Sequence, residues 1–150
     1  MEERTTSFFR FEDLRVYTKS QDYLAWLGNT VNYADSDPQD WLLRKWNDAA
    51  WGISISIVEG SARGRSQFEH LLRCSKTHIR ECVVCTQIAL RRNYITPEVA
   101  DQSRSYLMEL TRMTGSLLVS LQRNDNRSEN ADTYMDNNFY DTHSTPSDKA

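Results

Sequence analysis

The sequence of 150 residues predicts an all-α protein, an antiparallel up-down-up-down four-helix bundle. Apolar residues recur at helical spacing in four segments, and turn-forming residues separate these segments. The connections are short, so consecutive helices bury their apolar stripes most efficiently as antiparallel neighbours. Residues 51–58 alternate Ile and Ser, but they continue a helical stripe and no partner strand accompanies them.

Composition divides the chain into a flexible lead-in at residues 1–10, the bundle at 11–123 and a polar tail at 124–150. The tail holds six acidic and two basic residues, a net charge of −4, whereas the whole chain carries −3. Such a segment buries too little apolar surface to offset the entropy of ordering, so it is predicted to be disordered. Its Tyr134, Met135, Phe139 and Tyr140 leave a docking role open.

The first helix is predicted from about Phe11 to Tyr33, and the second from Pro38 to about Glu59. Asp37 is expected to cap the second helix, with Pro38 in its first helical position. The apolar stripe of the first helix consists of Leu14, Tyr17, Leu24, Leu27 and Val31. The stripe of the second consists of Trp41, Leu42, Trp46, Ala49, Ala50, Ile53, Ile57 and Val58.

A helical corner follows, in which Gly60 is expected to stop the second helix. Ser66 is predicted to cap the third helix, with Glu69 completing a capping box. This helix should run from about Gln67 to Asn93. Its core-facing residues are Phe68, Leu71, Leu72, Ser75, Ile79, Cys82, Val83, Thr86, Ala89 and Leu90.

The fourth helix is predicted to start with Thr96 as its cap and Pro97 in the first turn. It should fray after about Arg123, where the polar tail begins. Its apolar stripe consists of Val99, Tyr106, Leu107, Leu110, Met113, Leu117 and Leu121.

Four phrases of the chain resemble the four-helix bundle proteins encoded by intervening sequences in bacterial 23S rRNA genes. The opening Phe9-x-Phe11-Glu12-Asp13-Leu14-x-Val16-Tyr17 resembles the F-x-D-L-x-V-aromatic phrase before that family's first helix. Ser56-Ile57-Val58-Glu59-Gly60, a basic turn and Phe68-Glu69-His70-Leu71-Leu72 follow in the family's order. Glu81 matches a helix-three glutamate, and Asn93-Tyr94-Ile95 resembles a G-Y-(I/L) turn. Departures are Ser56, Thr77, His78 and Arg80, where the family has asparagine or small residues.

The resemblance implies a left-handed bundle that often assembles as a homopentamer and has no established enzymatic activity. It also extends distantly to the accessory proteins of diversity-generating retroelements, which bind nucleic acid and a reverse transcriptase through a basic surface. RNA or DNA is therefore the first expected partner class. The alternative is a protein-binding scaffold with no nucleic-acid role.

One stretch of the chain is distinctly basic. Between Gly60 and Ile95, seven basic residues stand against Glu69 and Glu81. The seven residues are Arg63, Arg65, Arg73, Lys76, Arg80, Arg91 and Arg92. A contiguous basic face neutralises phosphates and releases counterions, which favours nucleic-acid binding. The alternative is a solvated helix face paired with acids such as Asp22, Asp101 or Glu109.

The third helix also carries Cys74, His78, Cys82 and Cys85 at spacings of four, four and three. Soft ligands at such spacing can chelate zinc or copper. A single straight helix supplies only two ligands to one metal, so no metal site is expected and packing or a subunit contact is preferred. Cys74, His78 and Cys85 are therefore candidates for an oligomer interface.

Four tryptophans exceed what a narrow bundle core needs. Trp46 and Trp51 point about 140° apart on one helix, so they cannot both face the core. Both are candidates for an oligomer interface, where tryptophan is favoured. Self-association is therefore expected from the residues as well as from the resemblance.

No constellation of residues indicates catalysis. Glu59 lacks a second carboxylate or a histidine in phase, and it is expected to pair with Arg63, Arg65 or the turn backbone. The chain has no apolar run of membrane-spanning length and no signal-peptide pattern, which predicts a cytoplasmic protein without a membrane partner. We therefore expect a non-enzymatic protein with no cofactor.

Overall fold

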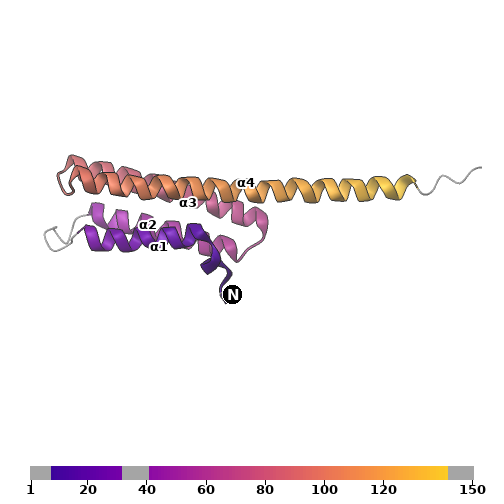
Figure 1. Ribbon diagram of the computed structural model, residues 1–150, viewed down its shortest axis with the longest axis horizontal. Coiled ribbons are helices and arrows are strands. Elements are labelled where there is room, and N and C mark those ends of the chain that lie inside the picture. Colours follow the sequence, from indigo (N-terminus) through magenta and orange to yellow (C-terminus); the bar gives the residue numbers. More distant parts are fainter. Residues whose placement is uncertain (1–7, 32–40, 142–150) are drawn as a thin grey trace, which may run out of the picture. The chain divides into compact units, whose positions relative to one another are not determined.

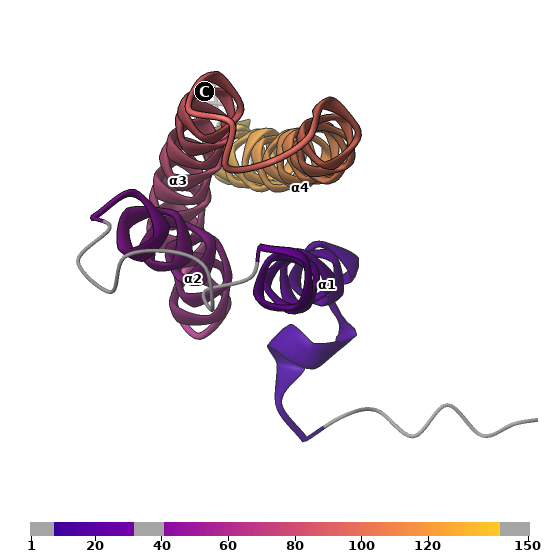
Figure 2. The same cartoon turned by 90° about the vertical axis from the view of Figure 1, so that its left-hand side faces the viewer.

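The computed structural model describes residues 8–31 and 41–141, with side chains as far as Arg127. These residues form the 3-10 helix η1 (Arg10–Asp13) and the helices α1 (Arg15–Thr30), α2 (Trp41–Ser61), α3 (Arg65–Arg91) and α4 (Pro97–Asp141). Consecutive helices run in opposite directions (Figure 1). Seen end-on, α1, α2, α3 and the start of α4 lie at four corners around a shared core (Figure 2). The predicted all-α bundle is confirmed, and the described residues contain no strand.

The first helix buries a different stripe from the predicted one. Its buried residues are Val16, Ser20, Tyr23 and Leu27, with Val31 just beyond its end. The predicted Leu14, Tyr17 and Leu24 are only half-buried. The predicted stripe has the wrong phase: it includes Tyr17 but omits Ser20 and Tyr23, whose hydroxyl groups bond across the core. The helix also starts at Arg15 rather than Phe11, after η1, and the expected break at residues 35–38 lies outside the described residues.

The corner between α2 and α3 differs from the prediction in two ways. Gly60 lies inside α2 and is buried, and a Cβ atom there would come within 2.7 Å of the Phe68 ring. Gly60 therefore permits close helix packing instead of stopping the helix. The cap of α3 is Gly64, not Ser66, and Glu69 lies 3.9 Å from Arg73 one turn along. The predicted capping box is wrong because the helix begins one residue before Ser66.

The turn between α3 and α4 follows the prediction. Asn93 has a φ of 59°, the left-handed conformation that ends many helices. The Asn93 N–H donates to Leu90 O and the Tyr94 N–H donates to Ala89 O, the pair of bonds of a Schellman motif. The Thr96 hydroxyl accepts a hydrogen bond from the Val99 N–H at 3.3 Å, and α4 starts at Pro97. The predicted cap and the proline in the first turn are confirmed.

The fourth helix is longer than predicted. Its helical backbone continues to Asp141 and does not fray after Arg123. Between Gly115 and Pro146 the sequence contains neither glycine nor proline, so no residue stops the helix, and adding a residue to an existing helix needs no new nucleus. The chain divides into two compact units, Met1–Leu118 and Val119–Ala150, and the bundle belongs to the first.

A chain of hydrogen bonds in the core joins all four helices. Trp46 Nε1 on α2 donates to Tyr23 Oη on α1 at 2.9 Å, and Tyr23 Oη lies 2.9 Å from Ser103 Oγ on α4. Ser103 Oγ lies 2.7 Å from Thr86 Oγ1 on α3, which donates to the Cys82 carbonyl. When each hydroxyl group donates to the next one along the chain, all three hydroxyl groups both donate and accept a hydrogen bond. The four side chains, at most 1 % exposed, thus bury their polar atoms without an unmade bond.

Candidate nucleic-acid interface

Helix α3 gathers basic side chains along one flank. At about 100° per residue, Arg65, Arg73, Lys76, Arg80 and Arg91 fall within about 80° of one another, beside the buried stripe that contains Leu72 and Ile79. From Arg65 to Arg91 this flank extends about 39 Å along the helix. Arg65 was expected in the turn, but the early start of α3 places it on the helix. We call these five residues, with Arg104 of α4, the basic flank.

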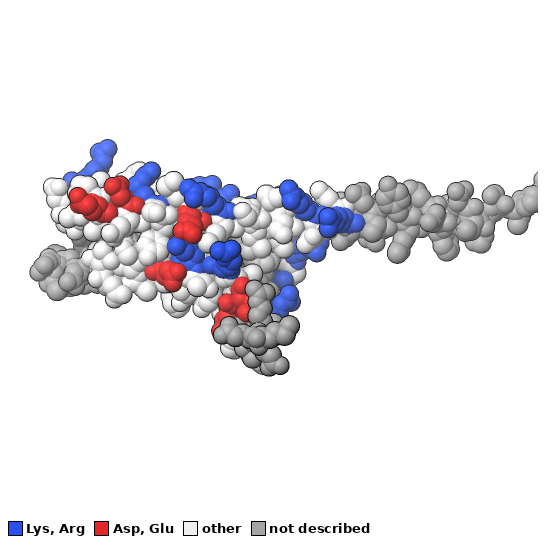
Figure 3. All heavy atoms as spheres, viewed as in Figure 1, with Lys and Arg blue, Asp and Glu red and all other residues white. Residues whose placement is uncertain are grey.

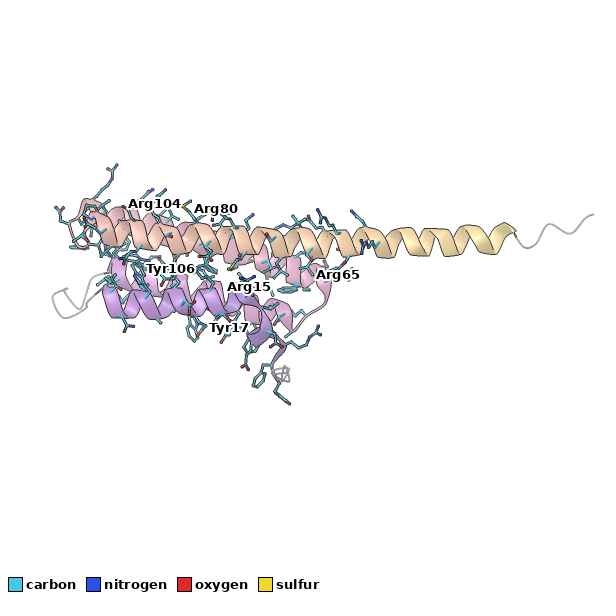
Figure 4. The ribbon with its side chains drawn as sticks, viewed as in Figure 1. Arg15, Tyr17, Arg65, Arg80, Arg104 and Tyr106 are labelled. Carbon is cyan, nitrogen blue, oxygen red and sulfur yellow. The ribbon has the colours of Figure 1, made fainter. Side chains whose placement is uncertain are left out.

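Arg104 was not among the predicted site residues. The Thr86–Ser103 hydrogen bond places it beside α3. Gln102 of α4 accepts a hydrogen bond from Trp26 of α1, so it marks the α1 side of α4. Arg104 points about 160° away from Gln102 and therefore lies on the α3 side of α4. Figure 4 shows Arg80 and Arg104 projecting from the same edge, and Figure 3 shows further Lys and Arg side chains along it, with a few Asp and Glu between them. The sequence held no signal for this neighbour, because the register of α3 against α4 was unknown.

Most charges of the basic flank are available to a ligand. Arg80, Arg91 and Arg104 are exposed and have no ion pair within the described part of the chain. Arg73, whose side chain is 55% exposed, lies 3.9 Å from the carboxylate of Glu69, whose side chain is only 14% exposed. Lys76 is half-buried beside the core. Glu109, one of the acids considered as a partner for this surface, pairs with Lys19 at 2.8 Å instead.

The remaining two predicted basic residues lie off the flank. Arg63 is 3.6 Å from Glu59, one turn earlier, which gives Glu59 one of its expected partners. The guanidinium of Arg92 lies over the Trp41 ring, 5.6 Å from its centroid. Both arginines are exposed. They extend the positive surface at the two ends of α3 without lying on its flank.

The five candidates for an oligomer interface differ in how deeply they are buried. Trp46 is fully buried, so it cannot contact a second copy, and this prediction is corrected. Cys85 is 6 % exposed and offers little surface to a second copy. Trp46 faces the core because its N–H bonds Tyr23. Trp51 is 60 % exposed, whereas Cys74 and His78 are half-buried. The sequence correctly placed one of the two tryptophans outside the core.

Trp51 belongs to an exposed apolar surface on α2. Ile55, one turn away, is 38 % exposed, and Val58 is half-buried on the same side. We call Trp51, Ile55 and Val58 the outer apolar face. His78 borders α2 elsewhere, because its ring would lie 2.9 Å from a Cβ added to Gly52. A surface with an exposed tryptophan at its centre is typical of protein contacts.

Cys82 and Cys85 do not have the surroundings of reactive thiols. Burial raises the pKa of Cys85 to about 11 and raises the pKa of Cys82 further. Cys74 lies 3.8 Å from His70 Nε2, one turn earlier. No group of three potential metal ligands occurs among the residues that the structure describes. The thiols of Cys82 and Cys85 therefore pack as small apolar groups.

One ion pair ties α1 to α4 on the other side of the bundle. The hydrogen bond from Lys19 to Glu109 raises the pKa of Lys19 and lowers that of Glu109. Lys19 also lies over the Tyr106 ring, 4.9 Å from its centroid. Lys19 and Glu109 therefore satisfy each other, and neither charge takes part in the basic flank. Within the described ranges, no helix has the length and apolar character needed to cross a membrane.

Comparison with known proteins gives a family and a fold. Residues 12–116 match the family described as 23S rRNA-intervening sequence protein. A crystal structure from Bacteroides thetaiotaomicron, of a protein with unknown function from the S23 ribosomal protein family, is 17% identical in sequence with a TM-score of 0.63. The similarity covers 69% of this chain and 97% of that one. No curated protein matches the chain.

Proposed function

Because the chain belongs to the family of 23S rRNA-intervening sequence proteins, we propose that it is a non-catalytic bundle that self-associates and binds nucleic acid. The basic flank of α3 and α4 is the proposed nucleic-acid surface. The outer apolar face of α2 is the proposed contact between copies. A homopentamer, implied by the family resemblance, is the assembly that we expect.

The observation that carries the nucleic-acid proposal is the flank itself. Its positive side chains follow one helix for about 39 Å, a length over which duplex DNA presents phosphates every ~3.4 Å on each strand. Arg80, Arg91 and Arg104 stand exposed without ion pairs in the described chain. Displacing counterions from phosphates would supply the binding free energy.

The chemistry of the flank favours binding without sequence preference. Its six residues are arginine and lysine, which bind phosphate oxygens as readily at one base sequence as at another. The flank also runs along the side of α3, next to α4. This geometry differs from that of a recognition helix, which inserts into the major groove and contacts base edges. Affinity should therefore depend on salt and length more than on sequence.

A salt titration tests the proposal. We expect the wild type to bind labelled RNA or DNA at low salt, with a slope of log K against log salt of about −4 to −5 for five phosphate contacts. The double variant Arg73→Glu/Arg80→Glu should weaken binding by tenfold or more and reduce the slope by about two. The matched control Arg10→Glu/Arg15→Glu changes the same charge on η1 and α1, away from the flank.

Two outcomes would contradict this function. A wild type that binds neither RNA nor DNA at low salt would remove it. Equal losses in the flank variant and in the control would show only a response to net charge. In either case the protein-binding scaffold becomes the better description.

Self-association is supported by Trp51, which is 60 % exposed and is the most exposed tryptophan among the described residues. In a ring of copies the basic flank would repeat, and weak phosphate contacts would add through multivalency. Sedimentation should find the wild type assembled at micromolar concentration and Trp51→Ser/Ile55→Ser dissociated. Met108→Ser, which alters an exposed side chain of α4, is the control. A monomeric wild type would rule out this contact.

A further inference from the structure

A groove separates the start of α2 from the middle of α3. Its volume is about 540 Å³, within the range of small-molecule and nucleotide sites. The residues that matter to the argument are Trp41 and Lys45 from α2, and Arg80, Glu81, Val84 and Ile88 from α3. The Cys85 side chain lies at its floor. Of the residues that line this groove, only Arg80 takes part in the proposed function.

The groove offers an aromatic ring to a ligand. Trp41 is 47 % exposed at the first position of α2, whereas Leu42 and Trp46 in the following turns are buried. Arg92 covers part of the Trp41 ring without lining the groove, so its contact leaves the groove open. Val84, 53 % exposed, adds a second apolar surface. A planar aromatic ligand could therefore stack on Trp41 and contact Val84 in this groove.

The groove also continues into the basic flank. Arg80 belongs to both, and Lys45 contributes a second positive charge against the single acid Glu81. Arg80 and Arg91 lie about 16 Å apart along α3, and Val84 and Ile88 fall between them. A polyanion that follows the flank would therefore pass the mouth of the groove.

We propose that the groove binds one unpaired nucleobase, which stacks on Trp41 while the adjoining phosphates contact Arg80 and Lys45. This rests on the proposed nucleic-acid function and adds a preference for single strands. Bases in a duplex are stacked on one another and cannot enter, whereas the face of an unpaired base is free. Stacking on an aromatic ring tolerates any base, so the preference concerns strandedness and not sequence.

Charge complementarity favours this occupant over an apolar one. An apolar peptide or a second copy that covered Trp41 and Val84 would also remove Arg80 and Lys45 from water, which is unfavourable without counter-charges. A nucleotide presents a ring and an anion side by side. It satisfies the aromatic wall and the two cations together.

Binding of three labelled probes tests the groove: an unstructured single strand as RNA, the same strand as DNA, and a duplex with equal phosphates. Trp41→Ala should weaken binding of the single strands by about tenfold, the loss expected for one stacked base, and change duplex binding by less than about twofold. Trp41→Phe, which keeps a ring, should recover most of the loss. Comparing RNA with DNA separates the two sources of an unpaired base.

Phe9→Ala is the matched control, because Phe9 is a 54 % exposed aromatic residue at the N-cap of η1 and does not line the groove. The N-terminal end of the chain lies away from the start of α2 (Figure 1). This variant should bind all probes as the wild type does. Unchanged single-strand binding in Trp41→Ala, with normal duplex binding by the wild type, would overturn the groove proposal alone. Equal loss on all probes together with a changed sedimentation coefficient would make a second copy the occupant. A wild type that binds no probe would overturn both this proposal and the proposed function.

Discussion

Tyr23 and Ser103 lie 80 residues apart in the sequence, and their hydroxyl oxygens lie 2.9 Å apart in the core. Neither residue belongs to an apolar stripe that the sequence predicts. Together they connect Trp46 on α2 to Thr86 on α3. Specific hydrogen bonds therefore hold the four-helix core together in addition to apolar packing.

Removal of the Tyr23 hydroxyl should destabilise the bundle. Tyr23→Phe leaves the buried Trp46 N–H without its acceptor, which costs about 1–3 kcal/mol. Tyr17→Phe is the matched control on the same helix, because Tyr17 is half-buried. Its hydroxyl has no partner among the described side chains. Denaturant unfolding should separate the two variants, and equal free energies of unfolding would show that the hydrogen-bond chain is not stabilising.

Alkaline pH should weaken the same region. Burial raises the pKa of Tyr23 and that of Cys82, so both groups keep their protons in the folded state after the unfolded chain has begun to lose them. Stability is therefore complete below the unfolded pKa values and falls as pH rises through about 9 and above. Unfolding free energies measured across this range should decline for the wild type. They should decline less steeply for Tyr23→Phe, which has one titrating group fewer, and identical slopes would contradict the prediction.

Two helical glycines should respond to alanine with opposite signs. At Gly60 a new Cβ would lie 2.7 Å from the Phe68 ring and 3.2 Å from Leu71 Cβ, so Gly60→Ala should cost about 1–3 kcal/mol through overpacking. At Gly115 no atom lies within 4 Å of the new Cβ. Gly115→Ala should therefore stabilise α4 by about 0.5–1 kcal/mol through helix propensity. Thermal unfolding would detect both changes, and stabilisation by Gly60→Ala would refute the close contact.

The left-handed residue between α3 and α4 gives a fourth test of stability. Asn93→Ala should lower the free energy of unfolding by about 1 kcal/mol, because alanine is strained at a φ of 59°. Asn93→Gly should lose nothing, since glycine adopts this conformation freely. Equal losses in both variants would mean that the asparagine side chain, and not the backbone, matters at this turn.

The sequence predicted well what depends on neighbours along the chain. The four helices, the Thr96 cap and the separation of Trp46 from Trp51 all follow from local spacing, and all are present. Local rules were less reliable where two interpretations were possible. Gly60 fits a helix stop as well as a close approach, and only the position of Phe68 decides between them.

What the sequence could not supply depends on contacts between helices. Tyr23 is absent from the predicted α1 stripe, which includes Tyr17 and follows another phase of the helix. Ser20 is absent because its hydroxyl group counts as polar until its partner is known. Ser54 Oγ, 2.8 Å from Ser20 Oγ, is such a partner. Arg104 joined the basic flank for the same reason, since its place beside α3 follows from the Thr86–Ser103 bond. The shared face of Arg73, Lys76, Arg80 and Arg91 follows from their spacing alone, whereas Arg65 joins it only because α3 starts at Arg65.

The hydrogen-bond chain through Trp46, Tyr23, Ser103 and Thr86 also limits how the helices can move. Apolar ridges allow one helix to slip past another by a turn, about 5.4 Å, with modest loss of contact. In this bundle each helix contributes one member of the chain, so a slip of any helix separates buried polar partners. The register of all four helices is thereby fixed at one level of the core, and the bundle should unfold as a single cooperative unit instead of helix by helix.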